Sequence, residues 1–122
     1  MRYTVSDAFE YALYCHCSKC RRATGSAFKA LAGTRRSNLN IDKGSDCLSI
    51  YGNEDAAHDA HCTKCGSLIF SVVRDGAYVH VAMGTLLDDP STRPSAHIFV
   101  GSKAAWHEIT DDLPRYSAFP ES

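Results

Sequence analysis

The spacing of the cysteines constrains this chain more than any other feature of its sequence. The chain has 122 residues and six cysteines, five of which fall into two groups. The groups are Cys15, Cys17 and Cys20, and then Cys62 and Cys65. Thiolates at such short spacings can place their sulfurs on one metal ion, about 2.3 Å from it in the case of zinc. The pattern favours a protein that binds one or two Zn²⁺ ions.

The reducing environment of the cytosol supports metal ligation over disulfide bonding. The segment Met1 to Phe9 has no apolar run of the kind that an export signal carries, and no stretch reaches the length of a transmembrane helix. We therefore expect a cytoplasmic protein with reduced cysteines and no membrane partner. We also expect Cys47, which stands alone before an apolar segment, to be a small, partly buried filler.

Length and charge limit the classes of protein to which the chain can belong. A chain of 122 residues with 44% hydrophobic composition predicts one domain over residues 1–122. Thirteen basic and fourteen acidic residues give a formal charge of −1, so no global field attracts nucleic acid. The sequence leaves the oligomeric state open.

The apolar segments predict an all-β domain. They are short, rich in Val, Ile, Tyr and Phe, and separated by Gly, Asn or Asp turns such as Gly52-Asn53 and Asp75-Gly76. We expect a meander of antiparallel strands at 9–17, 28–32, 48–51, 57–61, 68–73, 78–83 and 97–100. At most one short helix is expected, over residues 19–24, with Ser18 as its N-cap and Gly25 as its left-handed stop.

The first cysteine group can form an open metal site. In a strand over residues 9–17, Cys15 and Cys17 point to one face and His16 to the other, and Cys20 returns from the following turn. Three protein ligands leave one tetrahedral position for water or a substrate thiol, as in catalytic zinc sites. The alternative is a closed structural site in which His16, two of these cysteines and the second pair share one ion. Spacing alone does not separate these two arrangements.

The second group resembles a zinc knuckle. In Cys62-Thr63-Lys64-Cys65-Gly66, the glycine can adopt the positive φ that lets backbone N–H groups point at the sulfurs. A redox dithiol is the alternative, but no βαβ pattern surrounds the pair. His58 and His61 are spare ligands near the knuckle, while His80 and His107 are expected to be surface or core residues.

Basic residues follow the first group. Lys19, Arg21 and Arg22 could bind the carboxylates of a substrate, although short basic runs are usually solvated. Asp88-Asp89 and Asp111-Asp112 are expected in turns, and no residue is singled out as the general acid or base.

These motifs together resemble the glutathione-dependent formaldehyde-activating enzyme family, which also includes the vertebrate centromere protein V. The resemblance covers nearly the whole chain. It rests on three blocks: Cys15-His16-Cys17-Ser18-Lys19-Cys20-Arg21-Arg22 with Gly25 and Phe28; Cys62-Thr63-Lys64-Cys65-Gly66; and a tail with Gly84 to Pro90, His97-Ile98-Phe99, Ser102 to Trp106 and Leu113 to Tyr116.

The resemblance implies a β-tent-like fold with two zincs. It implies a catalytic zinc on Cys15, Cys17 and Cys20, and a structural zinc that Cys62 and Cys65 share with an earlier Cys-x-Cys. The activity implied is that of a carbon-sulfur lyase, which reversibly combines glutathione with formaldehyde. The alternative is a non-catalytic zinc module with a structural or protein-interaction role.

The chain departs from this pattern at its start, because no Cys-x-Cys precedes Cys15. The family's Cys-x-Cys-Gly-Ala-Val-Arg-Tyr segment would end at Arg2-Tyr3. We therefore expect Met1 to stand at the family's valine, as a start codon chosen too far downstream would give. Sequencing the native amino terminus tests this expectation.

Overall fold

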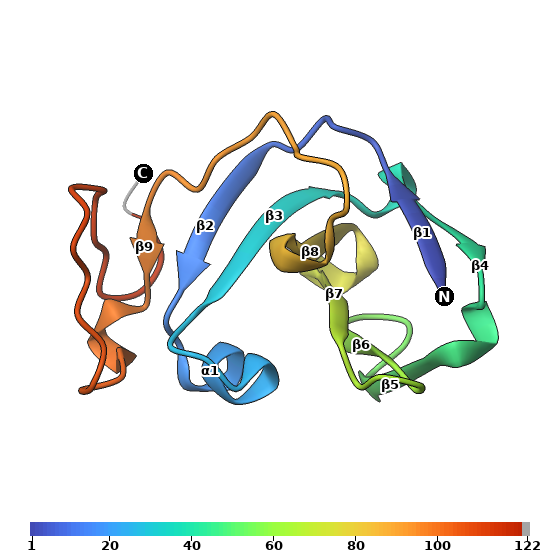
Figure 1. Cartoon of the computed structure of the whole chain (residues 1–122), viewed down its shortest axis with the longest axis horizontal. Helices are drawn as coiled ribbons and strands as arrows, with labels where there is room; N and C mark the ends of the chain where they lie inside the picture. The colour runs from blue at the N-terminus through green and yellow to red at the C-terminus, as the bar shows by residue number, and fades with distance from the viewer. Residues whose placement is uncertain (121–122) are drawn as a thin grey trace.

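The computed structural model describes residues 1–120 and confirms an all-β architecture with one α-helix in that range (Figure 1). The helix is α1 (Ser18–Thr24). The strands are β1 (Arg2–Val5), β2 (Tyr11–Cys15), β3 (Lys29–Arg35), β4 (Leu39–Lys43), β5 (Leu48–Gly52), β6 (His58–Cys62), β7 (Leu68–Val73), β8 (Tyr78–Ala82) and β9 (His97–Ile98). Short 3-10 turns are η1 (Arg36–Asn38), η2 (Ser45–Cys47), η3 (Arg74–Gly76), η4 (Met83–Thr85) and η5 (Val100–Ser102).

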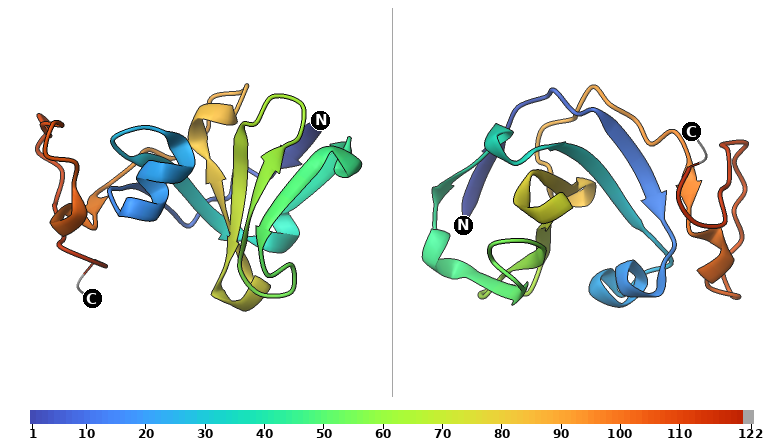
Figure 2. Two further views of the ribbon diagram at one scale, coloured as in Figure 1. Left: turned by 90° about the horizontal axis from the view of Figure 1, so that it is seen from below. Right: turned by 180° about the vertical axis from the view of Figure 1, so that it is seen from behind.

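Seven strands form one curved sheet in the order β5-β6-β7-β8-β3-β2-β9. The predicted antiparallel meander is confirmed for β5 to β8, and β2 and β3 also pair antiparallel. β9 differs, because it runs parallel to β2 and pairs Tyr14 with His97. The sheet arches over α1, which lies between the segment that follows β9 and strands β5 to β7 (Figures 1 and 2).

The second sheet consists of β1 and β4, neither of which was predicted. Each has only two apolar side chains among polar ones, which is a weak strand signal. Tyr3, Leu39 and Ile41 nevertheless pack on the main core, so alternation along both strands directs their apolar side chains inward. The two-stranded sheet therefore covers one face of the larger sheet at β6, β7 and β8.

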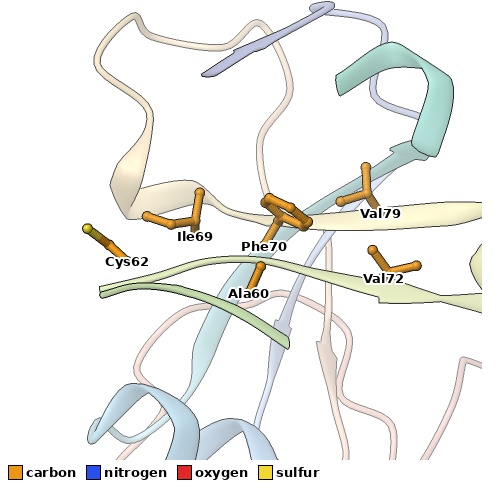
Figure 3. Packing of buried hydrophobic residues seen from close by; sticks show 6 residues of the cluster. All are labelled: Ala60, Cys62, Ile69, Phe70, Val72 and Val79. Atoms are coloured by element: carbon orange, nitrogen blue, oxygen red, sulfur yellow. The ribbon is translucent and has the colours of Figure 1, made fainter. Parts of the chain in front are cut away.

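The main core lies between these two sheets (Figure 3). It contains the buried side chains Ala60, Cys62, Ile69, Phe70, Val72 and Val79 from β6, β7 and β8. A separate smaller cluster contains Cys15, Leu31 and Ile98. The two cysteine groups therefore belong to different cores.

Gly33 is required where Tyr11 crosses the sheet. The two residues are paired between β2 and β3, and a Cβ on Gly33 would lie 2.2 Å from Cε2 of the Tyr11 ring. From this position the Tyr11 hydroxyl reaches Nε2 of His80, at 2.7 Å. The absence of a side chain at residue 33 thus allows the tyrosine to lie across β3.

Gly33→Ala is expected to lower the free energy of unfolding by about 1–3 kcal/mol, because the methyl group must displace the ring. Urea denaturation measures the change. Gly84→Ala is the matched control, since nothing lies within 4 Å of a Cβ there. Equal stabilities of the two variants would contradict the close packing, and adding Tyr11→Ala to Gly33→Ala should reveal coupling between the two sites.

No helix in residues 1–120 has the length and apolar character needed to cross a membrane.

Candidate metal centre

Three thiols converge where β2 meets α1. Cys15 is the last residue of β2, Cys17 precedes the helix, and Cys20 lies in its first turn. Their sulfur atoms all lie within 4.8 Å of one another. Within residues 1–120, no other group of three or more His, Cys, Asp or Glu side chains is placed to hold a metal ion. Soft thiolates at this spacing fit zinc or iron.

The helix begins one residue earlier than predicted, because Cys17 rather than Ser18 is its N-cap. Cys17 keeps an extended backbone (φ −65°, ψ 156°), and its sulfur accepts the backbone N–H of Cys20 at 3.3 Å. The strand ends at Cys15, so the prediction that Cys17 is delivered by the strand is wrong. The cap instead brings its sulfur to the other two thiols.

The end of α1 follows the prediction. Gly25 has φ +65° and its N–H bonds the carbonyl of Arg21, as a left-handed C-cap does. The hydroxyl of Thr24 donates to the Cys20 carbonyl at 2.8 Å. These contacts confine the helix to two turns and fix the position of Cys20.

The thiols do not behave alike in the absence of metal. The pKa of Cys15 is lowered to about 6, chiefly by a hydrogen bond from the Cys20 thiol; hydrogen bonding from Cys17 and the charge of Lys29 contribute, and burial opposes them. The same hydrogen bond, together with burial, raises the pKa of Cys20. Of these two sulfurs, Cys15 therefore loses its proton more readily and Cys20 retains its proton.

His16 lies outside this group of thiols and belongs to a chain of histidines. It is completely buried, and its Nε2 lies 2.8 Å from Nδ1 of His97. Nε2 of His97 in turn lies 2.9 Å from a carboxylate oxygen of Asp111. His97 and Asp111 were not predicted as partners, because their approach depends on the parallel pairing of β9, for which the sequence carries no signal.

The other predicted histidines have ordinary surroundings. His58 is buried, with Nδ1 3.2 Å from the Asn53 carbonyl. His61 is half-buried on β6, and the ring of His107 lies 6.1 Å from that of His16. Among the described residues, none of them joins a cluster suited to a metal.

His80 provides a pH-dependent contribution to stability. Burial, with the nearby charges of Lys29 and Arg74, lowers its pKa from 6.5 to about 4. The unfolded chain therefore binds a proton more readily, and stability falls as the pH drops from 6.5 towards 4.

His80→Gln should flatten this dependence. At pH 5 we expect the slope of unfolding free energy against pH to decrease by at most about 1.4 kcal/mol per pH unit, one proton's worth. Urea denaturation between pH 4.5 and 7 measures the slope. An unchanged slope would show that His80 is protonated in the folded protein.

The second pair of cysteines forms a knuckle on its own. The backbone N–H groups of Cys65 and Lys64 lower the pKa of Cys62, and Gly66 has the predicted positive φ of +77°. Cys62 belongs to the main core and Cys65 is exposed. The structure does not bring this pair to the first group, so the arrangement in which both groups share one ion is not formed.

The knuckle lies beside a groove of about 1180 Å³. Its walls come from β1 and from the segment Gly84 to Pro90, and Met1, Cys62 and Cys65 line it as well. Cys47, at the end of η2, is half-buried with its carbonyl bonded to the N–H of Thr63. The three converging thiols do not line this groove.

The predicted basic residues differ in their surroundings. Lys19 and Arg22 are exposed, and Arg22 bonds back to Ser18 of its own helix. Arg21 is half-buried, and its Nε is buried without a hydrogen-bond partner in residues 1–120. Arg21 is therefore the least exposed of the three basic residues of α1.

Fold and site together define a class: an all-β protein with a cluster of thiols capable of binding a metal ion, placed where a strand meets a short helix. The sequence model of the glutathione-dependent formaldehyde-activating enzyme family matches residues 1–102. The chain belongs to this family.

A solved structure supports the assignment of the fold. The chain is similar to a crystal structure of a Rhodobacter sphaeroides protein, with a TM-score of 0.58 and 26% sequence identity. The match covers 73% of this chain and 82% of the other. No curated protein matches the chain.

Proposed function

We propose that the protein is a zinc-dependent carbon-sulfur lyase acting on an adduct of an aldehyde with glutathione or a similar thiol. The observation that carries the proposal is the convergence of Cys15, Cys17 and Cys20 without a fourth protein ligand in residues 1–120. Family membership supports a glutathione-related thiol as substrate. Zinc, when bound, would lower the pKa of a thiol in its fourth position and keep it as thiolate at neutral pH.

The side chains of the site have separate tasks in this reaction. Cys15, Cys17 and Cys20 would hold the metal, and the half-buried guanidinium of Arg21 would bind a substrate carboxylate. Lys19 and Arg22, both exposed, would add weaker attraction for the same anionic substrate. Binding thiol and aldehyde at one place lowers the entropic cost of their encounter.

The bond changes balance without an added oxidant or reductant. The substrate sulfur forms a bond to the aldehyde carbon, the carbonyl π electrons move to oxygen, and that oxygen takes one proton. The thiol releases one proton, so the sum is an addition that runs in both directions.

Cys62 and Cys65 would hold a second, structural zinc together with further ligands from outside this pair. The N–H groups directed at Cys62 favour its thiolate, which supports this assignment.

Cobalt substitution tests the open position of the first site. Adding glutathione to the Co²⁺-loaded protein should strengthen the sulfur-to-metal charge-transfer absorption, because a further thiolate joins the ion. S-methylglutathione, which has no free thiol, is the control and should leave the spectrum unchanged. Exchange spectroscopy by nuclear magnetic resonance then measures catalysis as the rate at which formaldehyde and its glutathione adduct interconvert. A spectrum that does not respond to glutathione would favour a non-catalytic zinc module.

A further inference from the structure

A series of side-chain hydrogen bonds connects the residue between two of the clustered thiols to a distant carboxylate. His16 stands between Cys15 and Cys17 in the sequence, and its side chain is completely buried. Its Nε2 lies 2.8 Å from Nδ1 of His97, and Nε2 of His97 lies 2.9 Å from Oδ2 of Asp111. The segment that carries two of the three thiols is therefore tied to the part of the protein that follows β9.

The backbone of the same segment is also held by β9. Ile98 pairs with Cys15, and its carbonyl accepts the N–H of His16 at 3.0 Å. The segment 114–116 holds β9 in turn, because His97 donates one backbone hydrogen bond to it and accepts another from it. Backbone and side-chain contacts to His16 thus come from the same region of the protein.

His16 has no second polar anchor for its side chain. Its Nδ1 is buried without a hydrogen-bond partner in residues 1–120. The rings of Phe28 and His107 lie beside it, with centroids 5.4 and 6.1 Å from the centroid of His16. The contact with His97 is therefore the hydrogen bond that orients the ring.

The carboxylate gives this series of hydrogen bonds one direction. A carboxylate only accepts, so Nε2 of His97 carries a proton. In neutral His97 the other nitrogen, Nδ1, is then the acceptor, and Nε2 of His16 donates to it. A protonated His97 would place a charge in the interior and would also leave an N–H of His16 buried without an acceptor. The neutral arrangement therefore costs less.

The orientation of His16 bears on the thiols because it is the single residue between Cys15 and Cys17. The three sulfurs lie within 4.8 Å of one another, and a tetrahedral ion with bonds of about 2.3 Å holds its sulfurs about 3.8 Å apart. Little movement is needed when the peptide between the two cysteines is already fixed. Less ordering on binding means a higher affinity for the ion.

We propose that Asp111 and His97 are positioning residues of the metal centre: through His16 they hold Cys15 and Cys17 in the arrangement that binds the ion. The proposal rests on the metal site of the proposed function.

Asp111→Asn tests the direction of the hydrogen bonds. The N–H of Leu113 donates to Oδ1 of Asp111 at 3.0 Å, so asparagine keeps its oxygen there and turns its amide N–H towards Nε2 of His97. Both histidines should then exchange tautomers. Two-bond proton–nitrogen correlation spectra of the metal-free, isotope-labelled protein should show Nδ1 of His16 and His97 without a proton, and protonated in the variant.

Competition with a chromophoric chelator measures the dissociation constant for Co²⁺, independently of activity. Asp111→Asn should raise the constant about tenfold, as the loss of a residue that orients metal ligands does. Asp111→Ala should raise it less, because water can enter and accept the proton of His97. A space-filling role would give the opposite order, since asparagine has the shape of aspartate. Asp112→Asn neutralises the neighbouring exposed carboxylate and should change neither the constant nor the tautomers.

Circular dichroism establishes that each metal-free variant is folded, and Asp111→Ala carries the comparison if Asp111→Asn is not. Exchanged tautomers with an unchanged Co²⁺ affinity would overturn the positioning role, as would a greater loss in Asp111→Ala than in Asp111→Asn. Unchanged tautomers in Asp111→Asn would overturn the assigned direction and the role built on it. If the unmodified protein binds no Co²⁺, the metal site of the proposed function is wrong and the positioning role fails with it, while the tautomers still report whether the hydrogen bonds form.

Discussion

Cys17→Ser is expected to remove one equivalent of metal per chain while leaving α1 in place. Serine is a good N-cap, so it can accept the Cys20 N–H that the sulfur accepts now, at 3.3 Å. Serine cannot replace a thiolate on zinc. The two remaining thiols should therefore bind the metal more weakly by more than about 100-fold, which is a larger loss than the removal of a residue that only surrounds the ligands produces. Elemental analysis after dialysis measures the loss, and the proposed lyase activity should fall to background with it.

Two further cysteine variants locate the lost ion. Cys47→Ser alters a half-buried cysteine outside both groups and should keep the full metal content. Cys65→Ser should remove only metal bound at the knuckle. If Cys65→Ser instead empties the first site, the two groups cooperate in one centre, and the separation of their cores is not maintained in solution.

Phe70→Ala is expected to lower the free energy of unfolding by about 3–5 kcal/mol. Phe70 is 7% exposed in the main core, on the same strand as Val72 (β7) and next to the strand that carries Val79 (β8) (Figure 3). Removing the ring leaves a cavity that the flanking strands cannot fill without breaking their pairing. For a domain whose total stability is about 5–15 kcal/mol, this is a large fraction.

Urea denaturation of the metal-loaded protein measures this loss. Leu87→Ala is the control, because Leu87 is 100% exposed and should change stability by less than about 0.5 kcal/mol. Phe70→Leu should fall between the two. A small effect of Phe70→Ala would mean that the two sheets close over the vacated space.

The sequence predicted the parts of the fold that local chemistry determines. β7 was predicted with its observed bounds, Leu68–Val73, because it is an apolar run between turns that only Ser71 interrupts. Gly25 and Gly66 were placed correctly at positive φ, since few other residues adopt that conformation readily. The short spacing of Cys15, Cys17 and Cys20 similarly limited how far apart their sulfurs could lie.

Features that depend on distant partners were not predicted. β1 and β4 are strands because they pair with each other and cover the core, not because of their own composition. The burial of Lys29 and its pairing with Cys15 were not predicted, because both depend on how β3 lies in the sheet. Likewise, Asp111 was read as a turn residue, and its contact with His97 follows from the position of the chain after β9.

The parallel pairing of β9 with β2 has a consequence for protein synthesis. His97, which contacts His16 beside the clustered thiols, is 81 positions further along the chain. At about 5–20 residues per second, a ribosome needs roughly 4–16 s to make that interval. The nascent chain therefore presents three adjacent thiols throughout this time, before the strand that flanks them exists. Metal supply and protection from oxidation during translation thus matter more to this protein than they would if the edge strand came first.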